Sequence, residues 1–203
     1  MSDIMALDIE TGNYSWEIGG FGNKTLFAPT VIATWDGKGA TIFSKEEVEL
    51  EGATHHDMHP RTIGEHILNH VEKGGKLLGH NIINFDLPVI RDSLDCWSAS
   101  DVLQKHSDNL IDTKILVDKA SLPVGKIATS LDMLSKHTLN SGKSMKSVEA
   151  PKAWRAGKFK EVTEYCLKDA KLTYDLYMYG KENGIVKSRS LDSGEIIEVE
   201  VEW

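Results

Sequence analysis

The stretch IMALDIE, residues 4–10, is an apolar run that carries two acids at its end, Asp8 and Glu10. Short apolar runs bounded by turn residues are typical of buried strands, and Gly12 follows closely. Because residues two apart on a strand share a face, Asp8 and Glu10 point the same way. Two like charges on a half-buried sheet are costly unless something neutralises them. The alternative is a strand end that reaches solvent.

The segments that follow alternate between strand and helix patterns. Strands are predicted near 28–35, at 40–44, at 77–79 and at 109–117. Helices are predicted from Pro60 to Gly74, through Pro88 to about Leu94, near 128–138, and from about Phe159 to Lys181. Strands first, then helices interleaved with strands, indicate an α/β fold in which a mixed central sheet is flanked by helices.

The length of 203 residues favours one main domain, which we place at residues 1–183. Residues 184–203 are predicted to form a C-terminal β-hairpin appended to that domain. Its last stretch alternates apolar residues with acids, which is the period of a half-buried strand. The apolar positions are Ile197, Val199, Val201 and Trp203, and the acids are Glu198, Glu200 and Glu202.

Composition limits the class of protein and its partners. Hydrophobic residues make up 40% and charged residues 27% of the chain, as in globular proteins. The net charge of -8 has the wrong sign for a passive coat on nucleic acid, so a polyanionic partner would need local basic patches or bound cations. Two cysteines, no basic leader and no long apolar run predict a cytoplasmic protein that does not bind membranes.

A third acid interrupts the apolar face of the longest predicted helix. Val162, Cys166 and Thr173 follow the spacing of a core-facing stripe, and Asp169 falls within it. Tyr165 lies four residues earlier, so its hydroxyl can share that side of the helix. Such a carboxylate is either a buried acid with a partner or part of a Tyr and Asp pair that faces solvent.

A fourth acid, Asp86, follows the apolar strand at 77–79 by a short polar loop. It stands two residues before Pro88, where an acid is well placed to cap a helix or to interact with its dipole. A helix-start role is therefore the structural alternative for this residue.

Taken together, these motifs resemble a 3'–5' exonuclease of the DEDD group, in its tyrosine-containing DEDDy branch. The chain is similar to the proofreading domains of family B DNA polymerases and to their stand-alone relatives. The resemblance covers roughly residues 4–183 and implies an RNase H-like fold. The matching motifs are Asp8-Ile9-Glu10 with Thr11-Gly12, then Asn81 with Phe85-Asp86, then Tyr165 to Asp169. No polymerase domain follows, so a stand-alone nuclease is expected.

The resemblance implies that Asp8, Glu10, Asp86 and Asp169 hold two divalent cations, Mg²⁺ or Mn²⁺. Oxygen-rich acidic sites suit these ions, and four carboxylates balance the charge of two of them. Asp8 would bridge both ions, Glu10 and Asp169 would hold the ion that activates water, and Asp86 would support the second. Tyr165 would orient the attacking water, because a phenol with a pKa near 10 is a poor base.

The implied substrate is single-stranded nucleic acid with a free 3' end, DNA being favoured over RNA. Substrate contacts are predicted for Thr11, Asn81 and Phe85, and for a basic segment with interleaved aromatic residues, which suits phosphates and stacked bases. The candidates in that segment are Lys143, Lys152, Trp154 and Arg155. The alternatives are a core position for Phe85 and a solvated loop with Trp154 tucked into the core.

Two other functions remain open at this point. One keeps the fold and cuts internally, as an RNase H-like endonuclease does. The other is an inactive nucleic-acid-binding module with a degenerate site. Histidines at 55, 56, 59 and 66 match no zinc spacing, so a zinc site is not expected there, and His80 and His137 are expected to be structural.

Overall fold

The computed structural model describes residues 3–142, 145 and 147–203. Within them, six strands form one mixed sheet in the order β4-β3-β2-β1-β5-β6. The strands are β1 (Ile4–Thr11), β2 (Pro29–Trp35), β3 (Ala40–Ser44), β4 (Ala53–Asp57), β5 (Lys76–Gly79) and β6 (Leu110–Asp112). β1 is antiparallel to β2 and parallel to β5, so the strand direction changes beside the central strand.

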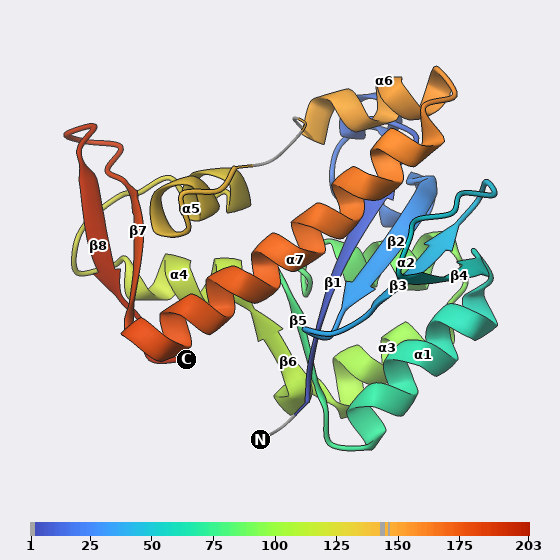
Figure 1. Cartoon of the computed structure of the whole chain (residues 1–203), viewed down its shortest axis with the longest axis horizontal. Helices are drawn as coiled ribbons and strands as arrows, with labels where there is room; N and C mark the ends of the chain where they lie inside the picture. The colour runs from blue at the N-terminus through green and yellow to red at the C-terminus, as the bar shows by residue number, and fades with distance from the viewer. Residues whose placement is uncertain (1–2, 143–144, 146) are drawn as a thin grey trace.

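Helices cover both faces of this sheet (Figure 1). Those of the first face are α1 (Pro60–Glu72), α2 (Asp86–Ser93) and α3 (Trp97–Lys105). The other face is covered by α6 (Ala150–Arg155) and by α7 (Phe159–Asn183), a long helix that crosses the sheet diagonally. The predicted α/β class, with a mixed central sheet flanked by helices, is confirmed by this arrangement.

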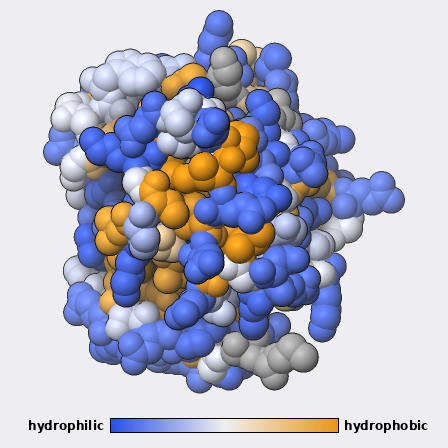
Figure 2. All heavy atoms as spheres, turned by 90° about the vertical axis from the view of Figure 1, so that its left-hand side faces the viewer, coloured by the Kyte–Doolittle hydropathy of each residue, from blue (hydrophilic) through white to orange (hydrophobic). Residues whose placement is uncertain are grey.

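The C-terminal hairpin is also present as predicted. β7 (Ile185–Arg189) and β8 (Ile196–Glu200) pair antiparallel. Val199 and Val201 are buried against α4 (Thr113–Ala120), α5 (Leu131–Thr138) and α7. The alternating acids Glu198, Glu200 and Glu202 are exposed. Figure 2 looks onto the hairpin side and shows a central group of hydrophobic side chains within hydrophilic surroundings.

One predicted strand is wrong. Residues 109–117 were expected to be extended, but β6 ends at Asp112 and α4 begins at Thr113. The Asp112 carboxylate accepts hydrogen bonds from the backbone N–H groups of Lys114 and Ile115, at 3.1 and 3.3 Å. This N-terminal cap stabilises the first turn of a helix, and it overrides the β-branched composition of the segment.

Among the described strands and α-helices, three lie in segments for which the sequence predicted neither strand nor helix: β4, α3 and α6. β4 is a half-exposed edge strand of sequence Ala-Thr-His-His-Asp, which lacks apolar alternation. It forms because β3 offers a parallel edge. None of the described helices combines the length and the apolar character that a membrane span requires.

Candidate metal centre and its cavity

The alternation of β1 determines where the two N-terminal acids face. Met5, Leu7 and Ile9 belong to the core between the sheet and helices α1 to α3. The even-numbered residues therefore face the opposite side, where α7 lies. Asp8 and Glu10 continue that row, and Glu10 is only 8% exposed.

The third acid comes from α7, the helix packed on that face. The Cys166 thiol donates to the backbone oxygen of Asp8 at 3.4 Å, so the helix contacts β1 directly at this level. Asp169 lies one turn further along and is 1% exposed. The alternative in which it faces solvent is therefore wrong.

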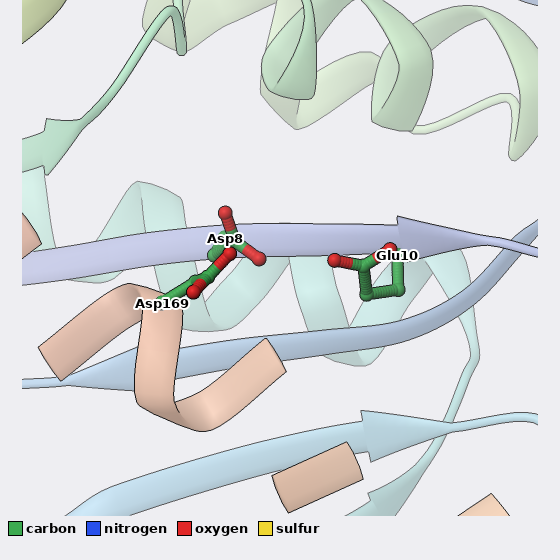
Figure 3. Close-up of side chains that lie close together, drawn as sticks. All are labelled: Asp8, Glu10 and Asp169. Atoms are coloured by element: carbon green, nitrogen blue, oxygen red, sulfur yellow. The ribbon is translucent and has the colours of Figure 1, made fainter. Parts of the chain in front are cut away.

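Asp8, Glu10 and Asp169 form a cluster in which each offers an oxygen within 4.8 Å of the others. Figure 3 shows Asp169 reaching from α7 to lie beside Asp8, with Glu10 further along β1. Anionic oxygens are the donors that Mg²⁺ and Mn²⁺ take in proteins, so this set fits a hard divalent cation. Among the residues that the structure describes, the histidines at 55–66 form no comparable group.

The negative charges of the cluster affect the neighbouring Cys166 thiol. Burial raises the pKa of the Cys166 thiol well above its ordinary value, and the charges of Asp8, Glu10 and Asp169 raise it further. The thiol therefore stays protonated and keeps its hydrogen bond to β1. A field of this sign attracts cations.

The fourth predicted acid joins the others at a cavity. Asp86 is the first residue of α2 and is 5% exposed. It lines a cavity of about 950 Å³ whose wall also includes Asp8, Glu10 and Asp169. The structure thus brings all four acids to one space, with three of them in the close cluster.

The position of Asp86 depends on the turn that follows β5. A Cβ on Gly79 would lie 2.4 Å from the Cβ of Ile82, so only glycine fits here. Asn81 then adopts a left-handed backbone with φ of 75°, a conformation that asparagine tolerates. The Asp112 carboxylate accepts from the backbone N–H groups of Asn81 and Ile83, at 2.9 and 3.1 Å. A single buried acid therefore caps α4 and holds the segment that leads to Asp86.

The three predicted substrate contacts outside the basic segment all line the cavity: Thr11, Asn81 and Phe85. The Phe85 ring meets the Phe27 ring edge-on at 5.2 Å, so it packs on other aromatic residues while still lining the cavity.

Tyr165 lies four residues before Asp169 on α7. It is 1% exposed and packs in the core with Val31, Ala33 and Val162. It is not among the described residues that line the cavity. Its expected role in orienting water stays a prediction.

The predicted basic segment is divided by the structure. Lys143 lies outside the described residues, and Lys152 is exposed on α6. Trp154 is partly buried against the core, with its ring 4.7 Å from that of Phe159. The structure therefore favours the core alternative for Trp154.

Arg155 links two segments that are distant in the sequence. Its Nε donates to the backbone oxygen of Gly12 at 2.8 Å, and its two terminal nitrogens contact both carboxylate oxygens of Glu17. The hydrogen bonds from Arg155, together with one from the Tyr14 backbone N–H, lower the pKa of Glu17 to about 2. The bidentate pair joins α6 to the loop between β1 and β2.

That loop carries cavity residues that the sequence did not identify. Tyr14, Trp16, Phe21 and Phe27 all line the cavity. One signal in the sequence could have identified them: aromatic residues are concentrated directly after the Asp-x-Glu motif. We interpreted that glycine-rich segment as a connecting loop only. Lys24, from the same loop, lies 4.8 Å from the centre of the Phe85 ring. Desolvation lowers the pKa of this lysine, and the charge of Asp86 opposes the shift.

Comparison with known proteins adds no assignment: no protein-family model matches this chain, and no curated protein matches it.

Proposed function

We propose that this protein is a metal-dependent 3'–5' exonuclease that hydrolyses phosphodiester bonds from the 3' end of single-stranded nucleic acid, with DNA favoured over RNA. The observation that carries the proposal is the convergence of Asp8, Glu10 and Asp169 within 4.8 Å in a cavity that also contains Asp86. The order and spacing of the motifs in the DEDDy exonucleases support the same reading.

The four carboxylates are the residues that would hold two divalent cations, Mg²⁺ or Mn²⁺. The chemistry that such cations supply is neutralisation of the charge developing on the scissile phosphate and a lowered pKa of nearby water. The protein's own contribution is to hold the acids in place. β1 and α7 do so for the close cluster, and Asp112 does so for the segment before Asp86.

The remaining cavity residues would position the terminal nucleotide. Thr11 and Asn81 offer polar groups at the wall, and Phe85 offers a ring. Holding the reacting group in one orientation converts a bimolecular step into an effectively unimolecular one. A volume of about 950 Å³ lies near the upper end of the roughly 300–1,000 Å³ typical of ligand sites, which leaves room for more than a single small group.

The test is Asp169→Asn, with Asp175→Asn as a matched control on the exposed side of the same helix. With Mg²⁺ or Mn²⁺, the unaltered chain is expected to shorten a 5'-labelled single strand stepwise. Asp169→Asn should slow this by about 100-fold or more, the scale seen when a charge-stabilising group is removed, whereas Asp175→Asn should not. Equal rates for the two variants would refute the proposal.

A strand with a blocked 3' terminus distinguishes the alternatives. An exonuclease that begins at the 3' end leaves this strand intact, whereas an RNase H-like endonuclease still cuts it. An inactive binding module cuts neither strand, and calorimetry would then detect no Mn²⁺ binding.

A further inference from the structure

The C-terminal hairpin has one strand edge that faces no other strand. In the part of the chain that the structure describes, β7 and β8 form a two-stranded sheet of their own, so β8 pairs with β7 alone. The other side of β7 is bridged to Ile127 through Ser190, whereas β8 lies at the left-hand margin of the molecule in Figure 1. An open strand edge presents backbone donors and acceptors with which another chain can pair.

The hydrogen bonds of the hairpin identify the groups that face this edge. The Val201 N–H donates to the backbone oxygen of Gly184 at 2.9 Å, and the register of that pair continues along the hairpin. Residues of an antiparallel strand alternate between bonding to the partner strand and pointing away from it. Odd-numbered residues of β8 therefore bond to β7. The backbone groups that point to the open edge are those of Ile196, Glu198 and Glu200.

The segment that carries this edge has charge of one sign. Residues 191–203 contain five acids and no lysine or arginine. Glu198 and Glu200 are both exposed. Ile196, two residues before Glu198 and so on the same face, is 48% exposed. The open edge therefore combines unpaired backbone groups with two acids and one apolar side chain.

The neighbouring strand shows which side chain suits this face. Lys187 of β7 lies directly across the ladder from Glu198, and its Nζ is 3.0 Å from the Glu198 carboxylate. Opposite charges on adjacent strands stabilise a sheet. A basic residue on a strand added to the other side of β8 would make the same kind of contact.

The acids disfavour two other occupants. A second copy that paired its β8 antiparallel about a two-fold axis at Glu198 would place this residue opposite itself, and like charges directly opposite are destabilising. Nucleic acid is a polyanion, so the same charges repel it. The occupant that the edge fits is an extended segment of positive charge.

We propose that the open edge of β8 is a docking site for an extended segment, rich in lysine or arginine, of a partner protein. The segment adds a third strand to the hairpin, with its basic side chains beside Glu198 and Glu200. In this mode of recognition, backbone hydrogen bonds supply affinity and the alternate side chains supply specificity. The inference goes beyond the proposed function, because β8 lies outside the described lining of the cavity and binding here requires no hydrolysis.

The test uses a dye-labelled peptide of alternating lysine and valine, seven residues long, and a second peptide with glutamate in place of lysine. Fluorescence anisotropy measures the binding of each to the full chain. The lysine peptide is expected to bind with a Kd below about 1 mM, the weak end of measurable affinities. The glutamate peptide should not bind.

A double variant tests the charges of the edge. Glu198→Gln with Glu200→Gln should weaken binding of the lysine peptide about 2- to 30-fold, the range for two exposed ion pairs. The matched control is Glu46→Gln with Glu47→Gln. It removes the same charge from exposed positions after β3, on the opposite side of the molecule from the hairpin in Figure 1, and should bind as the unaltered chain does.

A proline variant tests the backbone of the edge. Glu198→Pro and Glu198→Gln lose the same charge, but only proline also loses the N–H that faces outward, and edge strands tolerate proline at such positions. Glu198→Pro should bind the lysine peptide about 2- to 12-fold more weakly than Glu198→Gln, the range for one hydrogen bond. A lysine peptide methylated at every backbone nitrogen leaves the protein unaltered, keeps the charges and cannot donate. It should bind at least about 10-fold more weakly than the unmethylated peptide.

The docking site is refuted if the unaltered chain does not bind the lysine peptide, or if it binds the methylated peptide equally well. Equal losses in the two double variants would also refute it, because they would show attraction to the net charge alone. A dimer of the unaltered chain in sedimentation that dissociates in Glu198→Pro would assign the edge to a second copy and overturn the proposal. Preference for the unmethylated lysine peptide that depends on Glu198 and Glu200 supports it.

Discussion

Each carboxylate of the acidic cluster occupies a position where its element would otherwise carry an apolar residue. Asp8 continues the α7-facing row of β1, and Asp169 interrupts the buried stripe of α7. Burying several acids together disfavours their charged forms unless cations or hydrogen bonds compensate. The fold maintains the cluster because Ile4 and Ala6 of β1 pack with Tyr177 of α7, and α7 also packs against β2 and β3.

A histidine outside the site provides a test of the core. His66 on α1 lies with its Nε2 2.9 Å from the Thr34 hydroxyl, and burial lowers its pKa from 6.5 to about 4. The nearby His70 and His56 lower it further, and Asp36 opposes them. The neutral ring is therefore the form that the folded protein holds.

This shift predicts how stability depends on pH. Between about pH 4 and 6.5 the unfolded state binds a proton at His66 that the folded state does not. The free energy of unfolding should therefore fall as pH decreases through that window, by up to about 3 kcal/mol. Urea titrations at several pH values measure this. His66→Gln should have a shallower pH dependence, and an unchanged slope would contradict the assignment.

At the scale of elements, α4 and the segment after β5 depend on one side chain. The Asp112 carboxylate is 3% exposed and accepts four backbone hydrogen bonds, two from each segment. A buried donor left without a partner costs about 1–3 kcal/mol. The residue therefore contributes to stability and to the placement of Asp86.

Asp112→Ala is expected to lower the free energy of unfolding by about 2–4 kcal/mol, because it removes a cap and leaves buried N–H groups unsatisfied. Asp118→Ala is the matched control on the same helix. It removes only a partly exposed pair with Lys114, worth up to about 1 kcal/mol. Urea unfolding compares the two, and equal losses would show that Asp112 is not a special anchor.

At the scale of the whole molecule, a net charge of -8 coexists with a proposed polyanionic substrate. Cations bound at the cluster would reverse the local sign where the phosphate arrives. Because the folded chain assembles the acids and the unfolded chain does not, such cations should also stabilise the fold.

Millimolar Mn²⁺ is therefore expected to raise the melting temperature. At a concentration 100 times the Kd the gain is about 2.7 kcal/mol, or roughly 5–10 °C for a domain of this size. A double variant, Asp8→Asn with Asp169→Asn, should lose the shift. Differential scanning calorimetry measures the melting temperatures of the unaltered chain and the double variant. If Mn²⁺ raised both by the same amount, the ion would bind somewhere other than the acidic cluster.

Most of the sheet and the acids of the site could be predicted because they follow local periodicity. The period of two in β1 places Asp8 and Glu10 on one face, and the helical spacing of α7 places Asp169 among buried residues. The end of β6 could not be predicted in the same way. There the capping bonds of Asp112 outweigh a β-rich composition.

The sequence by itself determined the α/β class, most of the strands and helices and the acidic motifs, because alternation, helical spacing and turn residues are local properties. Only the tertiary structure decided that Tyr165 packs in the core, that Arg155 binds Glu17, and that aromatic rings from the loop after β1 line the cavity. Arg155 and Glu17 are 138 residues apart. Contacts over such distances depend on how the packed elements meet, and no pattern within a single segment encodes that.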